Sequence, residues 1–440
     1  MIRTNFYLQN SFSNKSVSER AFISDHREFI PELIAFLACF SPLLGTYSLP
    51  FFQIVSFSEL ALVLLIVLGL IHIWSSKKRI IINHLSIYLI YSLIISLFFW
   101  VIRYSGNGHT ILIRCLRDCL FFIFYGVICP TIIPFKKMLK WMKAFVALLF
   151  VGVVIQAFFH YIIGRNVHLW LSSLPLNYVI SNAGELAVLH NSVSFRFESF
   201  LLEPSYVAYY VGFFLAVILG TNLRKNLSWA ILSSFLLIVC GSFSGIIILA
   251  IEWACYYIFT KRYKQNIVHL LVIFAILSVA ILFLVLTNTL HNGIWTRLSE
   301  ILNPKLTTSG GHRIFRGFSI FQEYDVIEKI FGIGLGNTSP YLIESGLSDK
   351  YATMSSASFD YSSSFSYVLL SCGFIGFFIY WGILIRYALD KKTSLFFHCL
   401  IALVLLMLED NISFSAQYFL MLGVMFASDR KRQVTKFTNS

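Results

Sequence analysis

Long apolar runs dominate this sequence, and most of them end at a short cluster of basic residues. Each full run approaches the roughly 20 residues that an α-helix needs to cross about 30 Å of hydrocarbon. Of the 440 residues, 58% are hydrophobic and only 12% are charged, whereas a soluble domain carries roughly 25% charged residues. Hydrocarbon offers the backbone no hydrogen-bond partners, so runs of this length fold as transmembrane helices. The sequence therefore predicts an all-α polytopic membrane protein.

The apolar runs divide into about 12 transmembrane helices. Two of the runs, 229–259 and 394–428, have basic residues at both ends, and one helix cannot begin and end on the same side of a membrane. Breaks at 241–245 and 409–411 therefore split each run into two short helices. The expected spans are 30–48, 50–74, 84–104, 110–134, 144–163, 205–222, the two halves of 229–259, 267–287, 365–389 and the two halves of 394–428.

The basic residues predict the orientation of these helices. They gather in short loops, for example at 77–79 and 136–143, and all such loops fall on one side, which the positive-inside rule identifies as the cytoplasm. Both chain ends then lie in the cytoplasm. Because this distribution accounts for the formal net charge of +13, we do not expect the charge to bind nucleic acid.

The chain is expected to alternate between helical blocks and two long outer loops. Residues 1–29 are polar and lack the apolar core of a cleavable signal peptide. The polar stretch 288–363 contains no apolar run long enough to cross a bilayer, so it lies outside the hydrocarbon. The expected segments are a cytoplasmic tail (1–29), five helices (30–163), outer loop 1 (164–204), helices six to nine (205–287), outer loop 2 (288–363), helices ten to twelve (364–428) and a cytoplasmic tail (429–440).

We expect neither a metal ion nor a cofactor. All eight cysteines lie in or at the edge of apolar runs and none forms a CxxC pair, so neither a zinc site nor a disulfide framework is indicated. No Asp-x-Asp pattern occurs that would suggest a metal–nucleotide clamp. The glycine-rich stretch 331–336 lacks the strand–helix–strand context of a dinucleotide site. We interpret it as a helix stop followed by a tight turn.

Charged residues within apolar runs are the first candidates for function. A charge at mid-bilayer costs a few kcal/mol or more, so it faces the bundle interior or a water-filled cavity. Arg114, Arg117 and Asp118 are spaced to share one helix face. Either an Arg–Asp pair fixes helix packing, or Arg117 reaches a diphosphate inside the bundle. Arg103, near the end of a span, is expected to extend toward the lipid headgroups.

The end of outer loop 1 carries a second group of candidates. Pro204 suits the first turn of the sixth helix, which places Arg196 and Glu203 at the outer membrane face. One interpretation is a helix start with an acidic residue near its positive end. The other is an arginine that binds an anion beside a carboxylate that acts as a general base.

Outer loop 2 carries the third group. Arg313 and Arg316 lie three residues apart on an expected amphipathic helix over 312–324, so both can face one anion. Guanidinium groups bind phosphate through two parallel hydrogen bonds. The alternative is that these arginines contact lipid headgroups.

Three separated patterns together resemble the O-antigen polymerase branch of the bacterial O-antigen ligase/polymerase superfamily. They occur in the family's order and topology across about residues 190–380. The patterns are Arg196 followed by Glu203-Pro204 at the start of a span, Gly311-His312-Arg313 followed by an amphipathic helix and the stretch 331–337, and the stretch 362–365 leading to Gly373 and Gly376 in the tenth span.

The resemblance implies a GT-C-like fold and a glycosyltransferase of the bacterial inner membrane. Members of the family join sugars at the outer face of that membrane. The donor is an oligosaccharide repeat unit on a polyprenyl diphosphate, and the acceptor is a sugar hydroxyl. A flippase and a chain-length regulator are the protein partners that such a reaction implies.

The resemblance also implies roles for particular residues. Arg196 and Arg313 would hold the diphosphate and stabilise it as the leaving group. Glu203 is the expected general base, with Glu198 and His312 as alternatives. The further expected substrate contacts are Arg316, Arg117, His312 and Glu198.

Two other functions compete with polymerisation. A flippase for lipid-linked oligosaccharides also has about twelve spans, but we find neither repeated halves nor a transporter-like arrangement of loops. In the ligase branch of the superfamily a histidine precedes the two glycines of the tenth span, and Ser362 stands in that place here. This difference favours the polymerase over the ligase.

Overall fold

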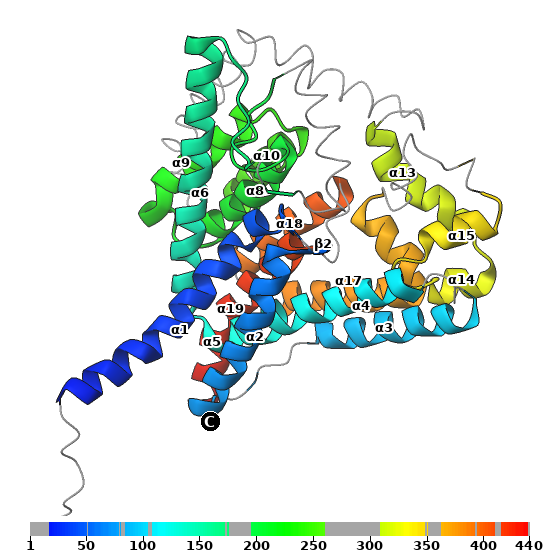
Figure 1. The fold of residues 1–440 in the computed structure, drawn as a ribbon, viewed down its shortest axis with the longest axis horizontal. Helices are drawn as coiled ribbons and strands as arrows, with labels where there is room; N and C mark the ends of the chain where they lie inside the picture. The colour runs from blue at the N-terminus through cyan, green and yellow to red at the C-terminus, as the bar shows by residue number, and fades with distance from the viewer. Residues whose placement is uncertain are drawn as a thin grey trace, which may run out of the picture.

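Most of the structure is helical, and one two-stranded hairpin is its only sheet among the residues that it describes (Figure 1). This agrees with the all-α class that the sequence predicts. The computed structural model describes residues 17–50, 52–78, 80, 84–103, 108–171, 174–175, 195–259, 309–347, 350, 362–391, 394–409 and 415–438.

In the part of the chain that the structure describes, five helical stretches are long and apolar enough to cross a membrane. The outward faces of α2 and α3 expose rows of large apolar side chains, such as Val67 and Ile94, which a water-facing surface would not favour. These helices are compatible with a membrane-embedded protein. Two of the stretches are single helices, α2 (Phe57–Ser75) and α3 (Leu85–Ile102). The third, Cys115–Ile132, runs through α4 (Gly108–Phe121), η2 (Phe122–Ile128) and α5 (Cys129–Ile132), and the fourth, Phe135–Ile163, consists of α6 (Phe135–Phe158) and η3 (Phe159–Ile163). The fifth is Ser364–Leu389 of α17 (Ser364–Lys391).

The other described helices of the bundle carry shorter apolar stretches, and they bear on the two predicted breaks. The first break is confirmed, because one helix ends at Val239, Gly241 has a φ of +61°, and the next helix begins at Phe243. Another helix ends at Glu409, the predicted second break. The ninth expected span, 267–287, lies outside the described residues, so the total of about 12 stays a prediction. These helices are α1 (Val17–Leu44), α8 (Pro204–Gly220), α9 (Leu223–Val239), α10 (Phe243–Phe259), α18 (Ser394–Glu409) and α19 (Ala416–Thr438).

Several helices extend beyond the predicted spans. The first helix already begins at Val17 and the last continues to Thr438, so both enter the predicted tails. The lysines of 136–143 lie on the first turns of α6, not in a loop. In these three places helix formation continues past the apolar run, because amphipathic and basic turns also form helix where they can reach water.

The hairpin replaces the expected start of the second span. Strands β1 (Ser48–Leu49) and β2 (Phe52–Ser56) pair antiparallel, and the helix begins only at Phe57. Ser56 caps this helix, since its Oγ accepts from the amide of Glu59 at 3.2 Å, and the Glu59 carboxylate accepts from the amide of Ser56 at 2.8 Å. This reciprocal pair is a capping box, which satisfies two amides that a helix start leaves without partners.

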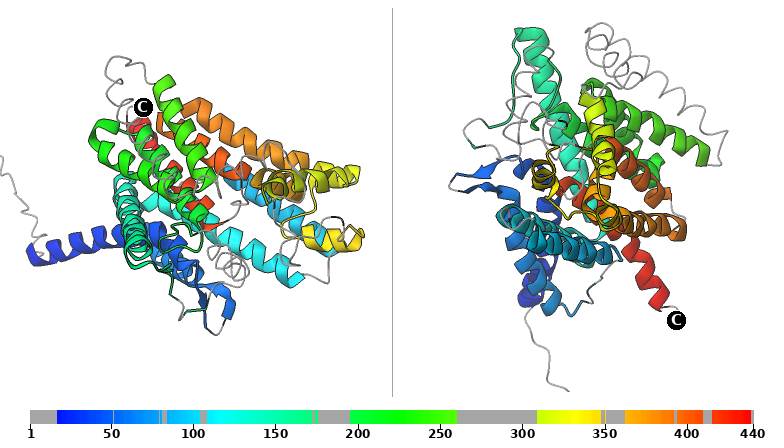
Figure 2. Two further views of the ribbon diagram at one scale, coloured as in Figure 1. Left: turned by 90° about the horizontal axis from the view of Figure 1, so that it is seen from above. Right: turned by 90° about the vertical axis from the view of Figure 1, so that its right-hand side faces the viewer.

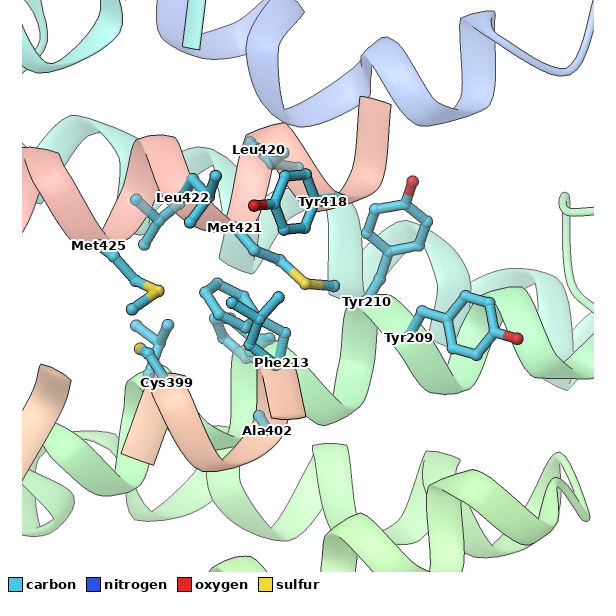
Figure 3. Packing of buried hydrophobic residues seen from close by; sticks show 14 of the residues in the cluster. Tyr209, Tyr210, Phe213, Cys399, Ala402, Tyr418, Leu420, Met421, Leu422 and Met425 are labelled. Carbon is cyan, nitrogen blue, oxygen red and sulfur yellow. The ribbon is translucent and has the colours of Figure 1, made fainter. Parts of the chain in front are cut away.

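The core of the bundle surrounds α8. Residues 207–220 of this helix are all buried, as expected for a helix that is apolar on every side. Figure 3 shows side chains of α8, α18 and α19 meeting there, with Phe213 between Met421 and Ala402. A Cβ on Gly220 would lie 3.0 Å from the backbone nitrogen of Leu395, so α8 and α18 cross closely at this small residue, a common device in membrane helix pairs.

Outer loop 2 contains a helical cap where the sequence predicted one amphipathic helix. Its helices are α13 (Ser309–Gln322), α14 (Val326–Phe331) and α15 (Thr338–Glu344). They gather against one end of α17 and α3 (Figure 2). The amphipathic helix expected over 312–324 is confirmed as α13, which starts three residues earlier. This cap contributes some of the candidate residues.

Candidate functional site at the outer ends of the helices

The glycine-rich turn of outer loop 2 is hydrogen-bonded to a break in α17. At Gly373 the backbone leaves the helical conformation, with φ 62° and ψ −168°. The carbonyl of Leu370 accepts from the amide of Ile333 at 3.1 Å, and that of Ser371 accepts from the amide of Gly334 at 2.8 Å. A buried carbonyl without a partner costs about 1–3 kcal/mol, so the turn supplies donors that the broken helix lacks.

Glycine is required on both sides of this contact. Gly332 and Gly373 adopt a positive φ with an extended ψ, a conformation that is essentially restricted to glycine. A Cβ on Gly332 would lie 2.5 Å from the backbone nitrogen of Cys372. The predicted helix stop and tight turn are therefore confirmed. The two glycine patterns, which the sequence shows only as separate motifs, form one structural unit.

Arg103 joins α3 to the cap of outer loop 2. Its guanidinium forms an ion pair with Glu328 of α14, and its Nε lies 3.6 Å from a carboxylate oxygen of Glu344 on α15. It also lies over the ring of Tyr341, 5.8 Å from the centroid. Burial raises the pKa of Tyr341 to about 12, so its hydroxyl stays protonated. Two acidic residues of the cap thus hold the guanidinium of Arg103, and its extension toward lipid headgroups stays a prediction.

Arg316 is buried where α13 packs on the start of α17. Only 1% of the residue is exposed, which argues against the lipid-headgroup interpretation for this side chain. A Cβ on the neighbouring Gly317 would lie 3.2 Å from the Cβ of Ser362, so α13 approaches α17 closely. The serines of this helix start, Ser362, Ser363, Ser364 and Ser366, are all buried.

Two further candidates of α13 fall outside what can be described. His312 and Arg313 belong to the first turn of this helix, but their side chains lie outside the described residues. Their expected roles, as an alternative base and as a ligand of the diphosphate, stay predictions.

The end of outer loop 1 packs on the C-terminal half of α6. Glu198 is 1% exposed, and its carboxylate receives a hydrogen bond from Nδ1 of His168. The amides of Glu198 and Ser199 both donate to Oε1 of Gln156, at 3.1 and 2.8 Å. The hydrogen bond to Glu198 raises the pKa of His168 above its ordinary value. Glu198 is therefore an interior residue of the loop and not a surface carboxylate.

Ser199 turns the chain back toward α8 in a strained conformation. Its φ is +57°, a left-handed backbone that costs an L-residue about 1–2 kcal/mol. The side chain offsets part of this cost by donating to the carbonyl of Leu149 at 2.8 Å. A Cβ on Gly152 would lie 2.9 Å from the ring of Phe200. The turn after Glu198 thus lies directly on the backbone of α6.

Glu203 and Arg196 flank this turn. Glu203 is the residue before α8, and Pro204 occupies the first turn as predicted. The Glu203 carboxylate accepts from Oγ of Ser205 at 2.8 Å, the contact of a helix start. Arg196 is half-buried, two residues before Glu198. These observations fit both interpretations of the site, since a helix-start acid can also face an outer cavity.

Arg117 is held by an acidic residue that sequence reasoning missed. It forms an ion pair with Glu59 of α2, in which Nη2 and Oε2 also lie 3.5 Å apart. Asp118, the acidic member of the proposed Arg–Asp pair, is buried. The side chain of Arg114 lies outside the described residues. The ion pair with Glu59 favours the packing interpretation of Arg117.

The described contacts place the candidates in three groups. Arg196, Glu198 and Glu203 lie together at the end of outer loop 1, Arg316 lies between α13 and α17, and Arg117 lies between α4 and α2. Among the residues that the structure describes, no group of three or more metal-ligating side chains occurs. The residues missed from the sequence are Glu59, His168, Gln156, Glu328 and Glu344.

One of these omissions had a detectable signal. The pattern Ser56-Phe57-Ser58-Glu59 is a capping-box sequence, and it would have placed the start of α2 and drawn attention to Glu59. The other contacts join residues far apart in the chain, and the sequence carries no periodicity that indicates them.

Comparison with known proteins adds no relative. A scan against models of protein families finds none that matches this chain, and a search of curated proteins finds no significant match.

Proposed function

We propose that this protein is a glycosyltransferase of the bacterial plasma membrane that joins polyprenyl-diphosphate-linked oligosaccharide repeat units into a surface polysaccharide at the outer face. The sequence resemblance to O-antigen polymerases suggests this function. Its main structural support is that two of the three sequence patterns pack against each other. The amides of Ile333 and Gly334 donate to the carbonyls of Leu370 and Ser371. Motifs that pack as one unit support a shared role.

The positions of the arginines support the electrostatic part of the reaction. A diphosphate leaving group develops charge as its bond to the sugar breaks, and preorganised cations lower the energy of that transition state. Arg316 is buried beside the serine-rich start of α17, where hydroxyls and the helix N-terminus also favour an anion. Arg313 lies one turn earlier on α13. Arg196 would approach the same diphosphate from outer loop 1.

The reaction itself needs a nucleophile and a leaving group. An acceptor hydroxyl oxygen forms a bond to the anomeric carbon of the donor, and the bond from that carbon to the diphosphate oxygen breaks. The electron pair leaves with the polyprenyl diphosphate. The hydroxyl proton passes to a base on the outer side of the membrane. The chain would supply these cations and the base from its two outer loops.

Replacement of the arginines tests the proposal in cells. We expect Arg196→Ala and Arg313→Ala to leave cells with single repeat units in place of long surface chains, by gel analysis of the surface polysaccharide. Arg165→Ala is the matched control, because Arg165 is an exposed arginine of outer loop 1, the loop that carries Arg196. Normal chain length in both variants, at normal protein level, would overturn the proposal.

Gel analysis of a deletion strain separates the polymerase from the two competing functions. Deletion of a polymerase leaves one repeat unit on each anchor. Deletion of a flippase removes all surface sugar, and deletion of a ligase leaves long chains on the polyprenyl carrier. Either of these last two phenotypes would replace the proposed function with the corresponding one.

A further inference from the structure

We infer that His168, positioned by Glu198, is the general base that accepts the proton of the acceptor sugar hydroxyl. This inference rests on the proposed function and assigns a residue to its proton-transfer step. His168 lies in outer loop 1, on the side of the membrane where the proposed reaction takes place.

The contact between the two side chains determines which nitrogen carries the proton. An ionised carboxylate only accepts hydrogen bonds, so Nδ1 of His168, which faces Oε1 of Glu198, carries a hydrogen and donates it. In the neutral ring the other nitrogen, Nε2, then has a free electron pair. The His168 side chain is 27% exposed and that of Glu198 only 1%. The pair therefore has one buried, orienting member and one member that reaches the solvent.

A single glutamine holds both halves of this pair. Gln156, at the outer end of α6, is completely buried. Its Oε1 accepts from the amides of Glu198 and Ser199, and its Nε2 donates to the carbonyl of Val167 at 3.0 Å. Val167 directly precedes His168, so the same side chain fixes the backbone on both sides of the contact. A base must be held within hydrogen-bond reach of the proton it abstracts, and this bridge provides that order.

The surroundings of His168 suit a saccharide acceptor. The ring of Trp170 lies 5.8 Å from that of His168 and is half-buried, so it offers an aromatic face beside the base. Arg196 lies only two residues before Glu198. The arginine proposed to bind the diphosphate and the carboxylate proposed to position the base are thus carried by one short segment.

Two other carboxylates are less suited to the role. Glu198 is too deeply buried to touch an acceptor hydroxyl directly. Glu203 precedes the first residue of α8 and accepts from Ser205, which is a helix-start arrangement. The inference therefore moves the base from Glu203, the choice from sequence, to His168, and it makes Glu198 a positioning residue.

The proton transfer balances with the bond changes. The acceptor hydroxyl proton moves to Nε2 of His168 as its oxygen forms the bond to the anomeric carbon. The bond from that carbon to the diphosphate breaks, and the electron pair leaves on the diphosphate oxygen. The imidazolium then returns its proton to water on the outer side. Throughout, the Nδ1–H bond to Glu198 stabilises the charged ring.

Polymerisation in membrane vesicles tests the inference. Vesicles from a deletion strain carry accumulated lipid-linked repeat units, and purified variants added in detergent are assayed for chain growth. A positioned general base contributes about 10²–10⁴-fold to rate, so we expect His168→Ala to lose about 100-fold or more, with partial rescue by added imidazole. His168→Gln keeps an amide that can donate to Glu198, and we expect the same loss without loss of folded protein. His160→Gln, in η3 just before the loop, is the control.

The pH profile separates a positioning role of Glu198 from a purely structural one. With wild type, activity should rise with pH through the raised pKa of His168, because the base acts only when neutral. Glu198→Gln removes the charge that raises this pKa, so the acidic limb should move to lower pH while the rate at high pH falls. An unshifted limb would overturn the role of Glu198.

The outcomes distinguish failure of the inference from failure of the function. If wild-type protein extends the repeat units and His168→Ala does so equally well, the inference is wrong and the proposed function stands. If wild-type protein does not extend them, the proposed function fails, and the inference fails with it.

Discussion

Gly373 of α17 lies against the backbone that ends α14, so closely that a Cβ on it would come within 2.5 Å of the carbonyl carbon of Ile330. Both Gly373 and Gly332, on the other side of the contact, have backbone conformations that side chains exclude. The contact joins the cap of outer loop 2 to α17, and its loss should separate them.

We predict that Gly373→Ala lowers the free energy of unfolding by at least about 2 kcal/mol, since the backbone strain alone is about 1–3 kcal/mol and the overlap adds to it. Thermal unfolding of the purified protein in detergent measures the change. Gly382→Ala is the control on the same helix, because a Cβ at Gly382 meets no atom within 4 Å. Equal melting temperatures for the two variants would contradict the structural role of the contact.

A second prediction concerns the ion pairs of the cap. Arg103→Ala should loosen α14 and α15, because it leaves the buried carboxylate of Glu328 without this cation. Arg103 is 40% exposed on its side chain, so solvent screening limits the pair itself to about 1 kcal/mol. Limited proteolysis of the cap should detect the change as faster cleavage.

The exposed pair of Lys350 and Glu323 provides the comparison. Lys350→Ala should leave the cleavage rate close to that of wild type, because exposed ion pairs contribute about 0–1 kcal/mol. If both variants are cleaved equally fast, the two pairs are equivalent and Arg103 has no special role in holding the cap.

The third prediction is a pH dependence of stability. Glu198 raises the pKa of His168, so the ring binds its proton more strongly in the folded protein than in the unfolded chain. The resulting stability is fully present below about pH 6.5, the ordinary value for histidine, and declines as the pH rises through the raised pKa. The melting temperatures of wild type and His168→Gln should therefore differ most at acidic pH and converge above neutrality. A difference that grows with pH would have the wrong sign.

The fourth prediction addresses Arg117. Removing one member of a partly buried ion pair leaves the other without compensation, whereas replacing both is often neutral. We expect Arg117→Met to lower stability by about 1–3 kcal/mol and the double variant with Glu59→Gln to recover most of it. Polymer length in the double variant decides the second interpretation. If stability recovers and long chains are still absent, Arg117 acts on the substrate as well as on packing.

Local features of the fold could be predicted from the sequence. The break after Val239, the start of α8 at Pro204, the amphipathic α13 and the turn at Gly332 all follow from residues within a few positions of one another. Glycine, proline and helical periodicity determine such features through short-range sterics. The hairpin before α2 was missed, because the mostly apolar stretch from residue 50 continues into the helix. Ser56, which ends the hairpin and caps α2, was the local signal for the boundary.

Contacts between distant residues could not be predicted in this way. Arg103 meets Glu328 and His168 meets Glu198 because helices and loops pack in a particular arrangement, and nothing in the local pattern of either residue identifies its partner. The same holds for the amides of the glycine turn and the carbonyls of α17. In each case the candidate residue was visible from its charge or its glycine, but its role depends on tertiary packing.

The kink in α17 has a consequence for the order of biosynthesis. The kink frees the buried carbonyls of residues 370 to 372 from the helix, and they accept from the amides of Ile333 and Gly334 and the hydroxyl of Tyr91. All three donors precede α17 in the chain, so the ribosome has already made them when this helix emerges. The bent helix can therefore be completed as it enters the membrane, without waiting for α18 and α19.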